Sequence, residues 1–98
     1  MTMTAFEIEP TPDAVSLRLN FDVTIEHARD LHAALVSALL PGRALAVDLS
    51  ALTRIDAAIL QVLLAAARTA AGARLTASSS VWTAALARHG LTDPFAQP

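Results

Sequence analysis

The sequence contains no cysteine, and this absence excludes several kinds of chemistry at once. Without thiol groups the chain can form neither a disulfide framework nor a thiolate zinc site, and it has no cysteine nucleophile. Glycine is also scarce: Gly42, Gly72 and Gly90 each follow a helical pattern, where glycine commonly ends a helix. No glycine-rich loop is left to cradle a phosphate, and we expect no cofactor.

Long apolar runs are missing as well. Although 54% of the 98 residues are hydrophobic, the longest candidate run, residues 57–67, is interrupted by Gln61. It falls short of the ~18–20 residues that span a bilayer. The N-terminus lacks the basic segment and apolar stretch of a signal peptide. We therefore expect a cytoplasmic protein without direct membrane insertion, with a single domain over residues 1–98 and a loose tail at 92–98.

Basic charge is low and dispersed. The seven basic residues are all arginine, they stand singly along the chain, and the net charge is −2. Only four aromatic residues, Phe6, Phe21, Trp82 and Phe95, accompany them. Nucleic-acid binding usually needs clustered basic side chains, so we expect no nucleic-acid partner.

Conventional catalytic and metal sites have no support in the sequence. His27 and His32 are five residues apart on a predicted helix, about 140° around its axis, so they do not form a metal-binding pair. His89 falls in the last turn of a helix, where a cation suits the helix dipole. The serines at 78–80 lack a nucleophile elbow and are better placed to cap the next helix. We predict no enzymatic activity and no metal site.

Hydrophobic periodicity predicts an α/β fold. The expected elements in chain order are strands at 5–10 and 15–21, a helix between Thr24 and Pro41, a strand at 44–49, a loop at 50–55, a helix at 56–71, a strand at 74–77 and a helix at 81–89. The strand at 44–49 is nearly continuously apolar, which is typical of burial on both faces. A mixed β-sheet with three to four helices packed on one side satisfies this order.

Asp22 and Asp56 are the polar residues of most interest. Each follows a strand or loop and precedes a helix, so both could lie at the same end of the sheet. A purely structural role is the simpler interpretation, because a carboxylate near a helix N-terminus stabilises the helix dipole by about 0.3–1 kcal/mol.

Residues 47–64 (VDLSALTRIDAAILQVLL) resemble the signature of STAS domains, the family of bacterial anti-sigma factor antagonists. That signature is a buried strand ending in Asp-Leu-Ser, a short loop, and Asp-Ser-Ser/Ala-Gly-Leu opening a helix. Upstream, Phe21-Asp22-x-Thr24 is similar to the family's entry into its first helix, and downstream His89-Gly90-Leu91 is similar to the end of a later one. The resemblance extends over about residues 5–92.

The resemblance implies a regulatory module that binds protein partners and is released by phosphorylation. By position, Asp56 is the motif aspartate, Asp22 is its neighbour across the sheet end, and Ala57 takes the place of the phosphorylated serine or threonine. A phosphate there would add about −1.5 to −2 charge in the middle of a contact surface. Alanine has no oxygen to phosphorylate, so we expect a phosphorylation-independent interface.

Two further departures concern the start of the second helix. Ala58 is a mild replacement, whereas Ile59 replaces a glycine and would fill space that relatives keep open for a partner or its nucleotide. A standard anti-sigma kinase is therefore a less favoured partner. The expected partner-binding residues are Asp22, Ser50, Thr53, Arg54, Asp56, Ala57, Ala58, Ile59 and Gln61.

Several alternatives stay open within this family. The chain resembles degenerate STAS proteins of chemotaxis systems, which often lack the acceptor, and this favours a role in bacterial signal transduction. It also resembles the small STAS subunit that binds the ATPase of phospholipid ABC transporters, although that subunit keeps a threonine where Ala57 stands. The partner could thus be an anti-sigma-type kinase, a chemotaxis component or an ATPase subunit. A small-ligand or nucleotide sensor, phosphorylation of Ser50 or Thr53 instead, and a homodimer are further possibilities.

Overall fold

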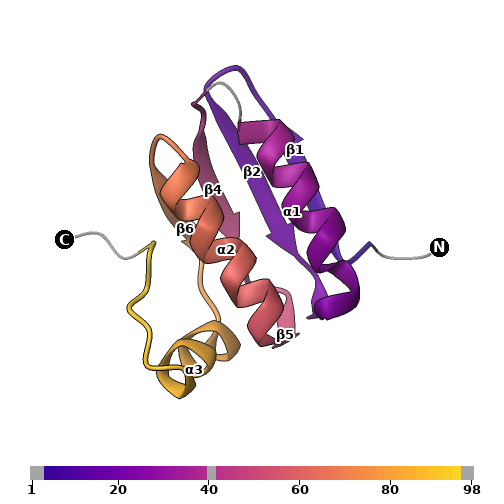
Figure 1. Cartoon of the computed structure of the whole chain (residues 1–98), viewed down its shortest axis with the longest axis vertical. Coiled ribbons are helices and arrows are strands. Elements are labelled where there is room, and N and C mark those ends of the chain that lie inside the picture. Colours follow the sequence, from indigo (N-terminus) through magenta and orange to yellow (C-terminus); the bar gives the residue numbers. More distant parts are fainter. Residues whose placement is uncertain (1–3, 40–41, 96–98) are drawn as a thin grey trace.

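A computed structural model describes residues 4–39 and 42–95. Four strands form the main sheet in the order β1-β2-β4-β6. The antiparallel pair β1 (Phe6–Pro10) and β2 (Ala14–Leu19) is the expected hairpin, and β4 (Ala44–Asp48) and β6 (Ala73–Ala77) continue the sheet in parallel (Figure 1). The mixed sheet and the α/β class are as predicted.

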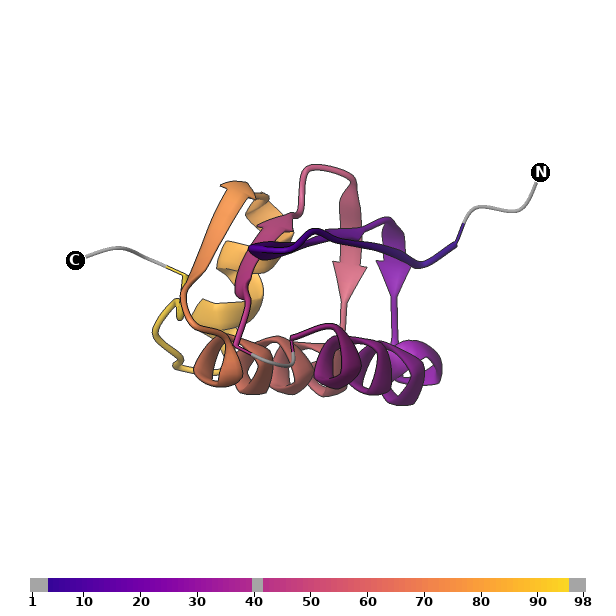
Figure 2. The same ribbon diagram turned by 90° about the horizontal axis from the view of Figure 1, so that it is seen from above.

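The three helices are α1 (Ile25–Leu39), α2 (Ala57–Thr69) and α3 (Ser80–Arg88). Figure 2 shows α1 and α2 side by side on one face of the sheet, and Figure 1 shows α3 at one end of the molecule. The sheet face and these two helices enclose a core of leucine and valine side chains. No helix in the part of the chain that the structure describes has the length and apolar character needed to cross a membrane.

Two short strands depart from the predicted order. β3 (Phe21–Val23) and β5 (Leu52–Ile55) pair in parallel as a separate two-stranded sheet. The expected strand at 15–21 therefore ends at Leu19, because buried Asn20 and Phe21, with a positive φ of 55°, turn the chain out of the main sheet. The expected loop at 50–55 is likewise wrong over its last four residues, which form β5.

Strand β4 is buried on one face only. Leu45 and Val47 are in the core, whereas Ala44, Ala46 and Asp48 are partly exposed on the opposite face. The prediction of burial on both faces is wrong because α1 and α2 both cover the same side of the sheet. Small alanines on the open face made this alternating strand resemble a continuous apolar run.

The helix termini differ from expectation in two places. α2 ends at Thr69, with extended Ala70 as its C-cap, so Gly72 is not the cap that its position suggested. Gly42 and Gly90 do adopt positive φ values, as expected of glycines that end helices. The predicted proline stop at 41 lies outside the described residues. Ser79 caps α3 by accepting a hydrogen bond from the Trp82 N–H, as predicted for this serine run.

Residues 91–95 pack against the domain and are not a loose tail. Phe95 is buried, and its ring centroid lies 5.7 Å from that of Trp82. Asp93 accepts hydrogen bonds from the Trp82 indole N–H at 3.3 Å and from the Phe95 backbone N–H at 2.9 Å. The prediction of a loose segment is therefore wrong for residues 92–95, because one aromatic pair and one carboxylate attach it. Residues 96–98 lie outside the described residues.

Candidate functional site

Asp56 joins the N-termini of two helices. It is the N-cap of α2, where its Oδ1 accepts a hydrogen bond from the Ile59 N–H at 3.3 Å. Its other oxygen accepts from the Ile25 N–H, the first residue of α1, at 2.6 Å. The predicted structural role of this carboxylate is thus confirmed and extends to a second helix. Because both oxygens are engaged, Asp56 fixes the relative position of the two helix starts.

Asp22 and Thr53 form a second polar contact nearby. The Thr53 hydroxyl donates to Asp22 Oδ1 at 2.9 Å, and the β3–β5 register sets Asp22 opposite Arg54. β5 runs from this contact directly into Asp56. The structure therefore brings Asp22, Thr53, Arg54 and Asp56 together, as the sequence predicted for the two aspartates.

The start of α2 presents small side chains to the surface. Ala57 and Gln61 are exposed and Ala58 is half-buried. Ile59 is fully buried in the core, so its assignment as a partner-binding residue is wrong. Ile59 lies about 200° around the helix axis from Ala57, so its side chain points into the core and neither contacts a partner nor obstructs the surface beside Ala57.

Ser50 belongs to a different local structure. Its hydroxyl and its backbone N–H both donate to Asp48 Oδ1, at 2.7 and 2.9 Å, and close the turn after β4. The Ser50 hydroxyl, and then its N–H, lower the pKa of the Asp48 carboxyl from its usual 3.8. Partial burial raises this pKa to a lesser extent, and the charge of Arg18 on β2 adds a smaller lowering.

Replacing Ser50 with alanine is expected to destabilise the protein by about 0.5 kcal/mol at neutral pH, since the carboxylate is largely solvated and screened. A carboxyl whose pKa is lowered by folding adds stability above its ordinary pKa, and this contribution is lost as the pH falls through the folded-state pKa. The difference from the parent chain should therefore begin to shrink as the pH falls to 3.8, and it should vanish once the pH is below the lowered pKa of the folded state. Urea unfolding across this pH range tests it. Ser37→Ala, at an exposed serine on α1, should give a pH-independent difference.

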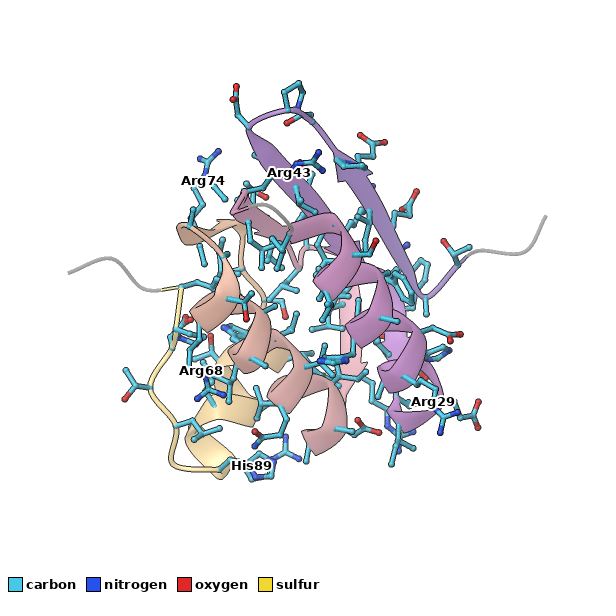
Figure 3. The ribbon with its side chains drawn as sticks, turned by 45° about the horizontal axis from the view of Figure 1, so that its top comes forward. Arg29, Arg43, Arg68, Arg74 and His89 are labelled. Carbon is cyan, nitrogen blue, oxygen red and sulfur yellow. The ribbon has the colours of Figure 1, made fainter. Side chains whose placement is uncertain are left out.

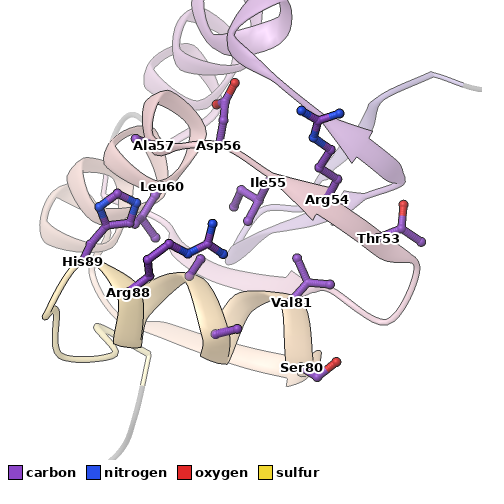
Figure 4. A pocket seen from close by; sticks show the side chains of 12 residues that line it. Thr53, Arg54, Ile55, Asp56, Ala57, Leu60, Ser80, Val81, Arg88 and His89 are labelled. Carbon is purple, nitrogen blue, oxygen red and sulfur yellow. The ribbon is translucent and has the colours of Figure 1, made fainter.

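An open cleft of about 720 Å³, the α2–α3 cleft, lies between β5, the start of α2 and α3. It is lined by Thr53, Arg54, Ile55, Asp56, Ala57, Leu60, Ser80, Val81, Ala84, Ala85, Arg88 and His89. Figure 4 shows the side chains of Arg88 and His89 rising from α3 toward α2, whereas Arg54 and Asp56 point away from α3. The site predicted from the motif thus forms one wall of a cleft whose other wall comes from the C-terminal third of the chain.

Other charged groups lie apart from the α2–α3 cleft, and Glu7, Glu9, Arg18 and Asp48 line a second hollow of about 300 Å³ on the main sheet. Figure 3 places Arg43 and Arg74 at one end of the molecule and His89 at the other. Among residues 4–39 and 42–95, no group of three or more histidine, aspartate or glutamate side chains could hold a metal ion.

Four surface residues near the site were not predicted as site residues. Ile25 is 69% exposed and Phe21 is 47% exposed, although each lies in an element that hydrophobic periodicity predicted. Alternation and helical spacing cannot reveal this, because the chain leaves the main sheet just before Phe21. Arg88 and His89 are exposed at the end of α3. Their proximity to Ala57 depends on the packing of α3 against β5 and carries no local sequence signal.

Comparisons with known proteins agree with this geometry. A family model described as "Mlab, STAS domain" matches residues 6–93. The fold is similar to that of an anti-sigma factor antagonist from Mycobacterium paratuberculosis, with a TM-score of 0.72 and 18% identity over 87% of this chain and 76% of that one. It is also similar to the anti-sigma factor antagonist SpoIIAA in its unphosphorylated form, with a TM-score of 0.69 and 20% identity over 82% and 80%. A comparison with curated protein sequences finds no match.

Proposed function

Because the chain belongs to the STAS domain family, we propose that it is a non-enzymatic regulatory adaptor that binds a protein partner through the surface around Ala57. Anti-sigma factor antagonists with this fold act through protein–protein interaction, which supports the general class. The finer parts of the proposal concern where the partner binds and whether phosphorylation releases it.

The observation that carries the proposal is an exposed apolar and polar surface along β3, β5 and the starts of α1 and α2, which we call the Ala57 face. It consists of Phe21, Asp22, Ile25, Thr53, Arg54 and Ala57. Hydrogen bonds hold its elements together, since the Thr53 hydroxyl binds Asp22, and Asp56, which precedes Ala57, accepts from the Ile25 N–H. Exposed large apolar residues beside a polar network are typical of protein interfaces.

The backbone of Phe21 gives this surface further support. A φ of 55° is unusual for a bulky residue and costs of order 1–3 kcal/mol. The Phe21 N–H donates to the Ala51 carbonyl oxygen at 2.9 Å, which holds the conformation. Aromatic residues often contribute a large share of the binding energy of an interface, so a strained and exposed phenylalanine is consistent with a contact residue.

The absence of a hydroxyl at Ala57 supports a constitutive interface. The neighbouring hydroxyls of Thr53 and Ser50 already donate to Asp22 and Asp48. We therefore propose binding that does not depend on phosphorylation at position 57, in bacterial signal transduction such as a chemotaxis pathway.

A second candidate function has its own support. The matching family model carries the description "Mlab", which favours a subunit that binds the ATPase of a phospholipid transporter. Such a subunit would use the same Ala57 face, so the two candidates differ in partner and not in site. If a partner captured from lysate were identified as an ATPase subunit, that result would support this second function.

Ala57→Glu is expected to weaken partner binding at least about tenfold, because it places a fixed negative charge where a phosphate would stand. The position is exposed and opens α2, where a carboxylate suits the helix dipole, so folding should be retained. The measurement is affinity capture from lysate of the source organism, followed by titration of the identified partner. Ala57→Gln is the matched neutral control and should bind within about threefold of the parent chain. Equal binding by the glutamate variant would place the interface elsewhere.

A further inference from the structure

We propose that the α2–α3 cleft receives an acidic segment of the protein partner, with a carboxylate of that segment bound between Arg88, His89 and the start of α2. This inference rests on the proposed adaptor function and adds the chemistry of the partner. It is carried by the unpaired basic groups of the cleft, by the engagement of its one carboxylate, and by its apolar floor.

The basic groups of the cleft have no partner within the protein. Among residues 4–39 and 42–95, the side chains of Arg88 and His89 make no hydrogen bond and no ion pair. His89 is directed toward Leu60 and Ala57 on the opposite wall, and Arg88 extends into the middle of the cleft below Ile55 (Figure 4). Cations at the end of α3 suit its dipole, and this explains their presence there. It does not explain why both side chains extend into the cleft.

Asp56, the only carboxylate of the cleft lining, does not neutralise Arg88 and His89. Asp56 is held by the N–H groups of Ile25 and Ile59 and points away from α3. Arg54, the third basic residue of the lining, also points away and would meet a partner outside the cleft. The end of the cleft near Arg88 therefore presents positive charge with no facing carboxylate, which is complementary to an anion.

The first turn of α2, which lines the cleft at Ala57, adds hydrogen-bond donors. The capping Asp56 accepts from the N–H groups of Ile59 and Leu60, through its side chain and its carbonyl respectively. The N–H groups of Ala57 and Ala58 have no acceptor among the described residues. Free N–H groups in the first turn of a helix attract carboxylates, and the short side chain of Ala57 leaves room for one.

The floor of the cleft selects a protein segment over a small anion. Ile55, Leu60 and Ala85 are buried and Val81 is partly buried in the lining of the same cleft. An occupant therefore needs an apolar side chain for the floor and a carboxylate for Arg88 and His89. Both groups occur side by side in an amphipathic acidic segment of a protein.

The test places a photo-crosslinking amino acid at Ala84, which is exposed and lines the cleft. We expect it to cross-link the captured partner within a segment that contains aspartate or glutamate, identified by mass spectrometry. Arg88→Glu should weaken binding of the purified partner by about tenfold, and the affinity should fall as salt rises. The matched control is Arg68→Glu on the exposed surface of α2, outside the cleft lining, with an expected change of less than about twofold.

Several results would overturn the inference. One is a cross-linked segment without acidic residues, and another is unchanged binding by Arg88→Glu. The third is displacement of the partner by inorganic phosphate at matched ionic strength, which would mean a site for small anions. A partner captured by the parent chain that never cross-links from Ala84 would remove the cleft assignment and leave the adaptor function standing. Capture of no partner at all would remove both.

Discussion

Asp56→Ala is expected to lower the free energy of unfolding by about 2–3 kcal/mol. Loss of a single N-cap typically costs about 0.5–2 kcal/mol, and this carboxylate serves the first turns of two helices. Both bonds are charge-assisted, which strengthens them, while water can reach the partly exposed site and limits the loss. Urea unfolding followed by circular dichroism measures the change.

Two control variants separate the double cap from a general loss of charge. Asp56→Asn keeps one oxygen acceptor, so it should satisfy one helix start and cost about 1 kcal/mol. Asp22→Ala removes a nearby carboxylate whose bond goes to the exposed Thr53 hydroxyl, and it should cost less than about 1 kcal/mol. If Asp56→Ala were no more destabilising than Asp22→Ala, the bridge between α1 and α2 would have no energetic importance.

This prediction also bears on function. In the family's motif the aspartate stands beside the phosphorylated position, so a loss of binding in Asp56→Ala could be mistaken for loss of a direct contact. The bonds to Ile25 and Ile59 show that Asp56 positions the Ala57 face. Weaker partner binding in this variant should therefore accompany reduced stability, whereas Ala57→Glu should weaken binding with stability retained.

Trp82→Ala is expected to have the largest effect on stability, about 3–5 kcal/mol, because it removes a fully buried indole from the core. The same change removes the contact with Phe95 and leaves Asp93 without the indole N–H donor. Residues 91–95 should then detach from α3. Protease protection of this segment, measured beside the unfolding midpoint, reports that local loss.

Trp82→Phe is the matched control, since it keeps an aromatic ring against Phe95 and removes only the N–H and part of the volume. It should cost about 1–2 kcal/mol. The difference matters for the α2–α3 cleft because Trp82 anchors α3, which carries Arg88 and His89. If the Trp82→Ala chain had the same urea unfolding midpoint as the parent chain, Trp82 and its contacts with residues 91–95 would not anchor α3.

Local patterns predicted the long elements well and the short ones poorly. The alternation at 15–19 and the spacing of Leu31, Leu35 and Leu39 placed β2 and α1 correctly, because each local period reflects one buried face. β3 and β5 have three and four residues, too few to establish a period, and their pairing joins segments about 31 residues apart.

The candidate site, too, was predicted from the sequence only in part. Asp56 and Ala57 could be placed at a helix start from the motif, and the proximity of Asp22 followed from strand ends meeting at one edge of a fold. The burial of Ile59 was not predictable from the motif, because substitution of a glycine says nothing about the direction of the new side chain. Only the packing of α2 on the sheet turns it inward.

The sequence by itself determined the class of the fold and indicated the family, and it places an alanine after Asp56. Composition, periodicity and short motifs are local properties, and each can be read without knowing which segments meet. The tertiary structure alone decided that Asp56 caps α1 as well as α2, and that Arg88 and His89 face Ala57 across a cleft. Both features join residues about 30 apart in the chain, and such contacts depend on how whole elements pack rather than on any local preference.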